Sequence, residues 1–446
     1  MTYLASIIRA GAVALLPCAL MAQAPVTLTL GGAARMAVQQ GAASAIGRTR
    51  VEQADARYRQ ARSALFPTIS ASAGENERNQ NTATFGFAFR DANGTPVFDP
   101  NGQILPAVKV FDLRGKATAN VVDLSVAARL RTVRSMVTIA EAEASGAGQQ
   151  AAAQAAATYV RAVRADAALS ARVADSTLAA ELLGIANDQL KAGVGVALDV
   201  TRARSQLAAS RAQLIAARNE RDRARLELSR ILGVDPSVPF VLVDSLAALP
   251  TDGAVPSAEE ATRTAISRRA DIRSVAAQER AARQQVSATR LERLPTLGVF
   301  GDQGAIGNGT AHLLNTYTWG LQVSLPLFDG FRREGRVQEQ QAQVHETDVR
   351  RRDLEAQAAI DVRAALLDLA SAREQLVAAD ERLELAQLEV EQARERFKAG
   401  VSGNADVITA SLGLNAARTM AVDARAAFQT ARVTLARAQG IVTELP

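Results

Sequence analysis

Cysteine and histidine are almost absent from this chain. Its 446 residues include one cysteine, Cys18, and two histidines, His312 and His345, which are 33 residues apart. A single cysteine cannot form a disulfide within the chain, and two distant histidines without cysteines do not match the ligand spacing of a zinc site. We therefore expect no disulfide framework, no thiol chemistry and no metal site, and we expect both histidines at the surface.

Aromatic residues make up only 4% of the chain, so a large conventional globular core is not expected. Alanine, leucine, arginine, glutamine and glutamate instead dominate the middle of each half, which is typical of long helices and coiled coils. Basic and acidic residues are interspersed along these stretches. That pattern indicates solvated helix faces and does not favour a nucleic-acid partner.

Signatures of catalysis are lacking as well. Gly301, Gly304, Gly307 and Gly309 resemble a phosphate-binding loop only superficially, because they lie between two expected strands and lack the following helix that such a loop needs. No nucleophile–base set is visible. The sequence therefore predicts a protein that is not an enzyme and holds no cofactor.

The N-terminal segment has the pattern of an export signal. Arg9 precedes a short apolar run, residues 10–20, and the small residue Ala22 follows it. The run is too short to span a bilayer as a helix, whereas this arrangement is typical of a secretory signal peptide. We predict a signal peptide over residues 1–22, which contains Cys18, so the exported chain would have no cysteine.

A long internal repeat organises the rest of the chain. Residues 190–194 match residues 397–401 in four of five positions, and the Asp-Val pair at Asp199 matches the one at Asp406 at the same offset of 207 residues. A repeat of this length indicates a two-fold duplication rather than a solenoid. The expected parts are a first repeat over residues 23–233, a linker over residues 234–256 and a second repeat over residues 257–446.

Each repeat is expected to run in the order helix, β-hairpin, very long helix, turn and shorter helix. The first helices are predicted over residues 29–64 and 257–293, and the second of these opens with a capping box at Ser257. The long helices cover residues 125–190 and 330–397, roughly 100 Å each at about 1.5 Å per residue. The other helices are about half as long, so two of them stacked end to end would match one long helix.

Apolar and polar residues alternate over residues 111–121 and 317–327. This length and pattern fit a strand that crosses a membrane in a β-barrel. Tyr317 and Trp319 lie at one end of the second segment, where membrane-interface aromatics would lie. An ordinary half-buried strand of a soluble sheet gives the same pattern. The first hairpin carries 22 extra residues, within residues 76–108, whose many turn residues predict a long loop.

Sustained heptad patterns follow the strands. Apolar residues recur at steps of four and three over residues 358–397 and again over residues 407–438, and one position of each heptad is nearly always alanine. This predicts tight antiparallel coiled-coil hairpins. In the first repeat Arg172, Ser176 and Arg221 fall on the seam, so these positions are expected to face a wetter partner.

Taken in order, these features resemble the TolC-like outer-membrane efflux protein family, also called outer membrane factors. The resemblance rests on the signal peptide, the Pro-Thr motifs at Pro67 and Pro295, residues 325–330 before the second long helix, and the paired Ala-Gly-Val turns. It covers nearly all of the exported chain. It implies a mainly α protein with a small β part, located in the outer membrane of a Gram-negative bacterium and extending into the periplasm.

The family implies a homotrimer. Each chain would give four strands to a shared 12-stranded β-barrel in the outer-membrane lipid, and its antiparallel coiled coils would give a third of an α-helical tunnel. Four strands alone cannot close, and an open sheet edge is not viable in lipid. Trimerisation would therefore supply what one chain lacks.

The paired turns would be the periplasmic tips of this tunnel. Gly193, Val194, Gly400 and Val401 are the candidates for docking a periplasmic adaptor protein. The adaptor would connect the channel to an inner-membrane pump of the RND, ABC or MFS type. Whatever their function, both glycines are expected to end their helices in left-handed geometry.

Asp199 and Asp406 are the candidates for the periplasmic tip or gate. Asp406 matches a family position whose carboxylates ring the constricted tip, where three such groups would attract cations. Asp199 matches a position that joins tip helices, and either aspartate could instead cap its returning helix. The best-known member has a tyrosine, an arginine and a second acidic residue where this chain has Phe397, Ser402 and Thr409. A closed tip must therefore be held differently here.

The function that follows is a passive exit duct, the outer-membrane channel of a tripartite efflux or type I secretion system. The alternative is a periplasmic coiled-coil adaptor of the membrane fusion type. That alternative explains the coiled coils, but it explains neither two equivalent hairpins nor the duplicated alternating strands.

Overall fold

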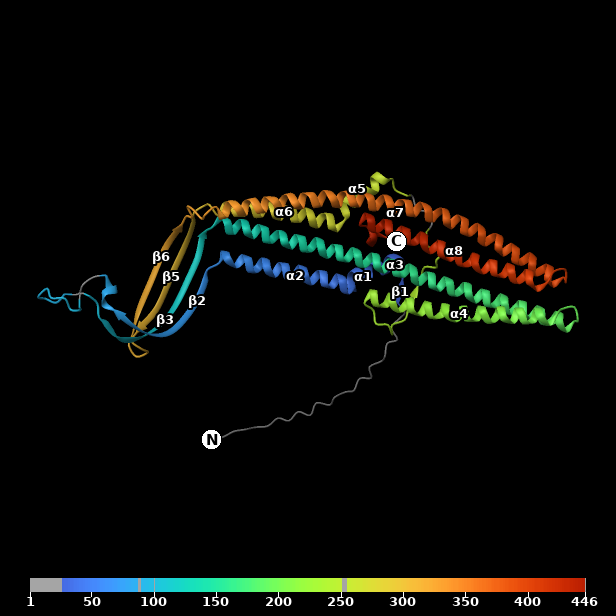
Figure 1. Ribbon diagram of the computed structural model, residues 1–446, viewed down its shortest axis with the longest axis horizontal. Coiled ribbons are helices and arrows are strands. Elements are labelled where there is room, and N and C mark those ends of the chain that lie inside the picture. The colour runs from blue at the N-terminus through green and yellow to red at the C-terminus, as the bar shows by residue number, and fades with distance from the viewer. Residues whose placement is uncertain (1–25, 87–89, 100, 251–254, 446) are drawn as a thin grey trace, which may run out of the picture.

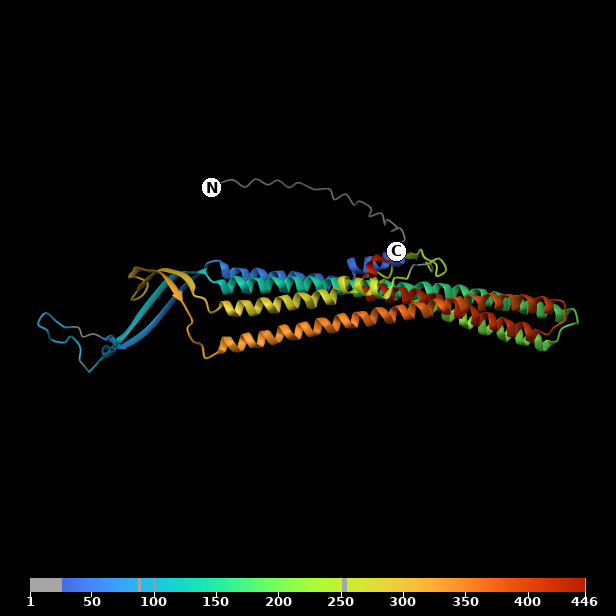
Figure 2. The ribbon, with the colours of Figure 1, turned by 90° about the horizontal axis from the view of Figure 1, so that it is seen from above.

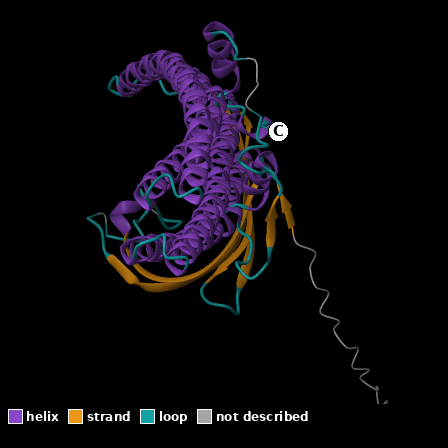
Figure 3. Ribbon diagram, turned by 90° about the vertical axis from the view of Figure 1, so that its right-hand side faces the viewer, coloured by secondary structure: helices purple, strands orange, loops and turns teal. Residues whose placement is uncertain are grey.

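The computed structural model describes residues 26–86, 90–99, 101–250 and 255–445 of the chain. These residues form an elongated molecule with a β-sheet at one end and a rod of helices that extends to the other (Figure 1). Seen end-on, the helices form a curved wall rather than a closed bundle (Figure 3). The predicted signal peptide lies outside the described residues.

The helices follow the predicted order in both halves of the chain. The long helices α3 and α7 begin and end within two residues of their predicted bounds, and the predicted capping box is present, since Ser257 and Glu260 bond each other's main-chain N–H. The helices are α1 (Leu30–Gln40), α2 (Ala42–Arg62), α3 (Leu124–Lys191), α4 (Ala197–Leu232), α5 (Ala258–Arg268), α6 (Ala270–Leu291), α7 (Arg332–Lys398) and α8 (Asn404–Gln439), with short 3-10 turns η1 (Ser63–Leu65), η2 (Thr82–Phe85) and η3 (Val442–Glu444).

Each predicted first helix is broken in two, so the prediction of single helices over residues 29–64 and 257–293 was wrong. Gly41 separates α1 from α2 with φ −61° and ψ 140°, and Arg269 separates α5 from α6 with φ −63° and ψ 129°. A Cβ atom at Gly41 would lie 2.3 Å from the carbonyl oxygen of Ala37. The first break therefore requires glycine, whereas the second rests on the side-chain contacts of Arg269.

The shorter helices end against these breaks. Gly233 ends α4 at φ 70° beside Gln40, and Gly440 ends α8 at φ 75° beside Arg268; a Cβ at either glycine would lie 3.1 Å from a main-chain atom of the break. The predicted end-to-end stacking is thus present. Helix α4 continues α2 along α3, and α8 continues α6 along α7 (Figures 1 and 2).

Four strands form one antiparallel sheet in the order β2-β3-β5-β6. They are β2 (Thr68–Asn81), β3 (Ile104–Val122), β5 (Thr296–Gly307) and β6 (Leu313–Ser324). Residues 82–103 join β2 to β3, whereas only residues 308–312 join β5 to β6. The predicted long loop in the first hairpin is confirmed.

The register of β6 corrects the predicted strand over residues 317–327. The strand begins at Leu313 and ends at Ser324, because Pro326 has no N–H to continue the ladder. Tyr317 and Trp319 therefore lie near the middle of the strand and not at its end. They pair with Gln303 and Gly301 of β5.

The core of the rod consists largely of small side chains. The predicted heptad seam of the second repeat is confirmed, since Val362, Leu369 and Leu376 of α7 are buried against Phe428 and Leu435 of α8. Alanine at the alternate positions lets the helix axes approach closely. No helix in the described residues is long and apolar enough to cross a membrane.

A small parallel pair, β1 (Val26–Leu28) with β4 (Phe240–Leu242), lies beside the middle of the rod. The buried Tyr159 of α3 fastens it, because its hydroxyl lies 2.9 Å from both the carbonyl oxygen of Leu28 and the carboxylate of Asp244. Asp244 also accepts the main-chain N–H of Leu30 at 2.9 Å. Burial and the neighbouring carboxylate both raise the pKa of Tyr159, so the hydroxyl keeps its proton.

Candidate functional site

The two turns α3–α4 and α7–α8 lie side by side at the end of the rod farthest from the sheet (Figures 1 and 2). Gly193 and Gly400 adopt φ 78° and φ 71° directly after the C-caps of α3 and α7, as predicted for helix-ending glycines. Val194 and Val401, which follow them, are 79% and 71% exposed. Each tip thus presents an exposed apolar side chain that nothing in the described part of the chain covers.

Asp199 and Asp406 occupy the third position of α4 and α8. The N-caps are Val196 and Gly403, and neither makes a side-chain capping bond. The alternative that the aspartates cap their helices is therefore wrong, although carboxylates in the first turn still suit the helix dipole. Asp199 lies 3.9 Å from Arg202, whereas Asp406 is exposed and makes no ion pair within the described residues.

Both tips share one apolar core, which is centred on Phe397 of α7. Its ring is 2% exposed and packs with Leu182 of α3, Val200 of α4 and Val407 of α8, together with Ala186 and Ala203. The sequence predicted Phe397 as the last apolar position of the heptad seam and as the residue that stands in place of the family's tyrosine. The structure shows that it also joins the two hairpins.

Two amide side chains tie the hairpins across this core. Gln189 donates to the carbonyl oxygen of Phe397, and Asn404 donates to the carbonyl oxygen of Asp199, both at 2.8 Å. Asn404 is 0% exposed, and its Oδ1 has no hydrogen-bond partner within the described residues. Neither amide was predicted from the sequence as a contact residue.

The internal repeat contained the signal that would have identified these amides. At the offset of 207, the counterparts of Gln189 and Asn404 are Arg396 and Ala197. Both amides therefore depart from the repeat: Gln189 lies directly before its matched segment, and Asn404 lies among the four unmatched residues, 402–405, that separate its two parts. At these two positions the hairpins present unlike residues, and both amides are used in the contact between the hairpins.

A buried carboxylate lies farther from the tips, where α3 meets α8. Asp175 is 1% exposed and binds Arg172 at 3.2 Å and Arg418 at 2.7 Å. Arg172 also donates to Thr419 of α8 at 3.0 Å. The wetter partner predicted for Arg172 is thus the second repeat of the same chain. The contact is a buried ion cluster of Asp175, Arg172 and Arg418.

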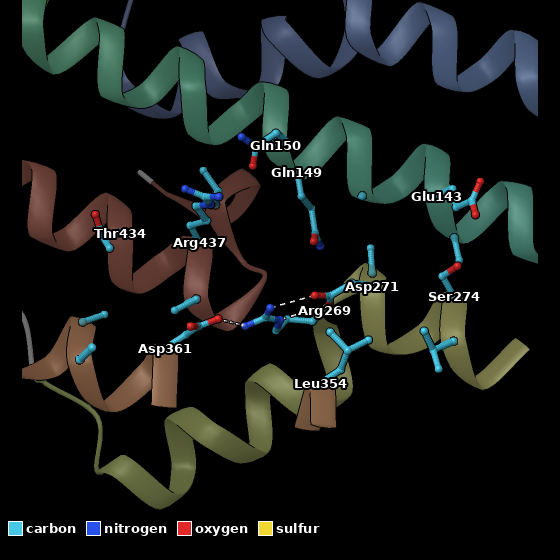
Figure 4. A pocket seen from close by; sticks show the side chains of 18 of the residues that line it. Glu143, Gln149, Gln150, Arg269, Asp271, Ser274, Leu354, Asp361, Thr434 and Arg437 are labelled. Atoms are coloured by element: carbon cyan, nitrogen blue, oxygen red, sulfur yellow. Dashed lines mark hydrogen bonds and ion pairs between the residues drawn. The ribbon is translucent and has the colours of Figure 1, made fainter. Parts of the chain in front are cut away.

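A cavity of about 750 Å³ opens at the α5–α6 break, between α3, α6, α7 and α8 (Figure 4). Arg269 projects into it and binds Asp361 of α7 at 2.7 Å and Asp271 at 2.8 Å. Burial acts to raise the pKa of both carboxyls, but the hydrogen bonds from Arg269 outweigh it and lower both pKa values. The lining holds two arginines, Arg269 and Arg437, against the four carboxylates of Glu143, Asp271, Asp361 and Asp368. No group of acidic, cysteine or histidine side chains in the described residues could hold a metal ion.

The sheet has one apolar and one polar face. Tyr317 and Trp319 are exposed on the same face of β6 as Leu321 and Val323. On the opposite face Arg114 of β3 contacts Asp302 of β5 and donates to Thr316 of β6 at 3.1 Å. Gly304 makes room for this arginine, because a Cβ there would lie 2.9 Å from the Cα of Arg114.

Comparisons with known proteins agree with this geometry. Residues 261–441 match the family described as outer membrane efflux protein. The chain is 27% identical to Protein CyaE of Bordetella pertussis over 399 residues, which is 88% of this chain and 80% of that protein.

Solved structures share the fold over most of the chain. The outer membrane protein VceC of Vibrio cholerae superposes with a TM-score of 0.71 at 18% identity, over 92% of this chain and 96% of that one. The CmeC outer membrane channel of Campylobacter jejuni superposes with a TM-score of 0.73 at 18% identity, over 92% of this chain and 85% of that one. At such low identity the likeness shows the fold, in which a helical rod extends from a sheet.

Proposed function

We propose that the chain is an outer-membrane channel that extends into the periplasm, because its residues 261–441 match the outer membrane efflux protein family and its fold matches solved outer-membrane channels over 92% of the chain. We further propose that three copies assemble into one passive exit duct. The sheet carries this proposal. Its edge strands β2 and β6 have no partner on their outer sides within the described residues, and an unpaired edge is not viable in lipid. Pairing β6 of each copy with β2 of the next would close a 12-stranded barrel from three sheets of four strands.

The two faces of the sheet suit this arrangement. The apolar face with Tyr317 and Trp319 would contact lipid, and the polar face with Arg114 and Asp302 would line the water-filled interior. The curved wall of helices would then give one third of the periplasmic tunnel (Figure 3). Tyr317 and Trp319 are proposed as the aromatic side chains of the membrane region.

The energy for export would come from partners. We propose that a periplasmic adaptor docks on the six tips of the trimer, two per chain, through Gly193, Val194, Gly400 and Val401. Both valines are exposed. The adaptor would connect the duct to an inner-membrane pump of the RND, ABC or MFS type. Tripartite efflux and type I secretion need the same duct, so the proposal covers both. A membrane fusion-type adaptor is not supported, since the likeness to an outer-membrane channel covers 92% of this chain.

We further propose that each chain holds its own tip closed. Phe397 and the amides of Gln189 and Asn404 join the two hairpins within one protomer, where the polar lock of the best-known member is missing. Outward movement of the α7–α8 hairpin would break both hydrogen bonds and expose the ring of Phe397. Asp406, exposed beside these contacts, is the candidate for lining the constriction.

The test of the duct is membrane fractionation followed by planar-bilayer recording. The full chain should fractionate with the outer membrane, require detergent for extraction, run as a trimer and form ion-conducting channels. Recovery in a soluble periplasmic fraction without detergent would overturn the proposal. A monomer that forms no channels in bilayers would do the same.

A further inference from the structure

The positive charge of the chain is concentrated where the helices meet the sheet. The helix ends next to the strands, taken as four segments of twelve residues, carry twelve arginines and no lysine against six acidic residues, while the rest of the chain holds 39 basic and 40 acidic residues. These segments are residues 55–66 at the end of α2, 123–134 at the start of α3, 283–294 at the end of α6 and 329–340 at the start of α7.

Local carboxylates do not neutralise this charge. Five of the six acidic residues already pair with other arginines, namely Asp55 with Arg59, Asp123 and Glu292 with Arg129, Glu334 with Arg293, and Asp329 with Arg333. Six further arginines are exposed and make no ion pair with any residue that the structure describes. One is Arg332, whose charge acts on the nearby carboxylate of Asp329, and the other five are Arg57, Arg62, Arg131, Arg134 and Arg290. Two of these lie over aromatic rings, Arg62 at 5.7 Å from the centre of Phe66 and Arg134 at 5.5 Å from that of Tyr58.

Exposed apolar side chains lie between these arginines and the strands. Phe66 precedes β2, and Leu327, Phe328 and Phe331 lie between β6 and α7; all four are more than half exposed. Phe328 and Phe331 meet edge to face at 5.6 Å. Phe331 adopts φ 62°, a left-handed backbone conformation that residues other than glycine rarely adopt. Large exposed rings in a row need a partner that covers them.

We propose that this arginine–aromatic belt, formed by Arg57, Arg62, Arg131, Arg134, Arg290, Phe66, Leu327, Phe328 and Phe331, binds anionic phospholipids of the periplasmic leaflet. The inference rests on the proposed function, which places the sheet in the outer membrane. The apolar side chains lie at the level of the upper acyl chains, and the arginine stems extend beside them to the lipid phosphates. Arginine suits this role because its planar guanidinium donates two parallel hydrogen bonds to a phosphate.

Lipid accounts for the belt better than a soluble anion does. A site for a dissolved anion in the tunnel needs arginines but no exposed rings, whereas a leaflet boundary has phosphates and hydrocarbon in the same order as the arginines and rings of this chain. The ends of α2, α3 and α6 contribute the arginines, and the segment before α7 contributes three of the apolar side chains, so the belt follows the boundary between sheet and helices rather than one pocket. Anionic headgroups would therefore fix the depth of the channel in the membrane.

The experiment measures phospholipid retained by the purified full-length trimer after exchange from detergent into vesicles of phosphatidylcholine with or without phosphatidylglycerol. One variant replaces the five arginines, as R57Q, R62Q, R131Q, R134Q and R290Q. The matched control removes the same charge from exposed, unpaired arginines elsewhere on the rod, as R204Q, R211Q, R218Q, R223Q and R382Q. Native mass spectrometry counts the phosphatidylglycerol molecules that remain bound.

We expect the wild type and the control to retain phosphatidylglycerol in preference to phosphatidylcholine, and the belt variant to lose this preference by about tenfold or more. Added salt should weaken the preference of the wild type, a result that needs no variant to fold. Equal retention by the belt variant and the control would overturn the proposal. Competition by inorganic phosphate at the same concentration as lipid would also overturn it, since it would indicate a site for a free anion.

Failure of the belt is distinguishable from failure of the duct. Channel formation in planar bilayers is recorded for the same preparations. A wild type that inserts and conducts, together with a belt variant that binds phosphatidylglycerol normally, refutes only the belt. A wild type that neither inserts nor conducts refutes the duct.

Discussion

The side-chain amide of Asn404 donates a hydrogen bond to the main-chain carbonyl oxygen of Asp199, 2.8 Å away. This bond joins the first turn of α8 to the first turn of α4, although the two residues are 205 positions apart. Gln189 and Phe397 make the matching contact at the ends of α3 and α7. The tips of one chain are thus fastened to each other by residues that differ between the repeats.

The amide ties should control opening of the tip. The double variant Gln189→Ala and Asn404→Ala removes both hydrogen bonds and should increase single-channel conductance while trimer yield stays normal. Each bond contributes only about 1 kcal/mol, so its loss should widen the tip without unfolding the protein. Recording in planar bilayers, with the exposed Gln387→Ala as control, checks this. Identical conductance in the double variant and the control would refute the lock.

Asp406 offers a second test at the same end of the channel. If three exposed carboxylates surround the constriction, they attract cations, and Asp406→Ala should reduce both cation selectivity and block by divalent cations. Asp199→Ala is the matched variant, because its carboxylate lies beside Arg202 and is already partly neutralised. Unchanged selectivity in Asp406→Ala, with normal trimers, would leave this aspartate with a helix-dipole role alone.

The buried ion cluster should be essential for the α3–α8 contact. Asp175→Ala leaves Arg172 and Arg418 facing each other without a counter-ion, which should cost about 3–5 kcal/mol. Removal of the exposed Asp188 on the same helix, which pairs only with exposed Lys191, should cost less than about 1 kcal/mol. Thermal unfolding of the detergent-solubilised trimers compares them, and equal melting temperatures would contradict the prediction.

Tyr159→Phe should destabilise the middle of the rod by about 1–3 kcal/mol, because the buried carbonyl oxygen of Leu28 and the carboxylate of Asp244 lose their shared donor. Tyr317→Phe removes the same hydroxyl from an exposed ring and should change stability little. Hydrogen exchange of β1 and α1 locates the effect. Faster exchange elsewhere, with β1 unchanged, would show that the hydroxyl does not fasten this pair.

The ion pairs of Arg269 predict a dependence of stability on pH. The folded pKa values of Asp271 and Asp361 lie below the ordinary value of 3.8, so their contribution is complete above pH 3.8 and is lost as the pH falls through the folded pKa values. Asp361→Asn should therefore lower the melting temperature at neutral pH and flatten its decline in acid. The exposed Asp353→Asn, on the same helix, serves as control. Parallel melting curves against pH for the wild type and Asp361→Asn would refute this.

The sequence by itself determined the order of the main elements, although it showed neither the breaks in the two first helices nor the small β1–β4 pair. Heptad spacing located the buried seam of α7 at Val362, Leu369 and Leu376, and the glycines after Lys191 and Lys398 marked both tips. These features depend on residues within a few turns of one another, where periodicity and backbone conformation are set locally. Even the error at β6 was one of bounds, since a proline ended the strand early.

Tertiary structure alone decided the rest. Helix-favouring residues surround Arg269, and only its bond to Asp361 on α7 reveals why the chain turns there. Phe397 packs between the two hairpins, and Asp175 binds both Arg172 and Arg418. These contacts join residues far apart in the chain. The repeat made the two hairpins alike, and their side-by-side packing uses matched positions such as Val200 and Val407 together with unmatched positions such as Gln189 and Asn404. Those positions acquire meaning only when both hairpins are placed in space, because a hydrogen bond or a buried ring requires its partner within a few ångströms.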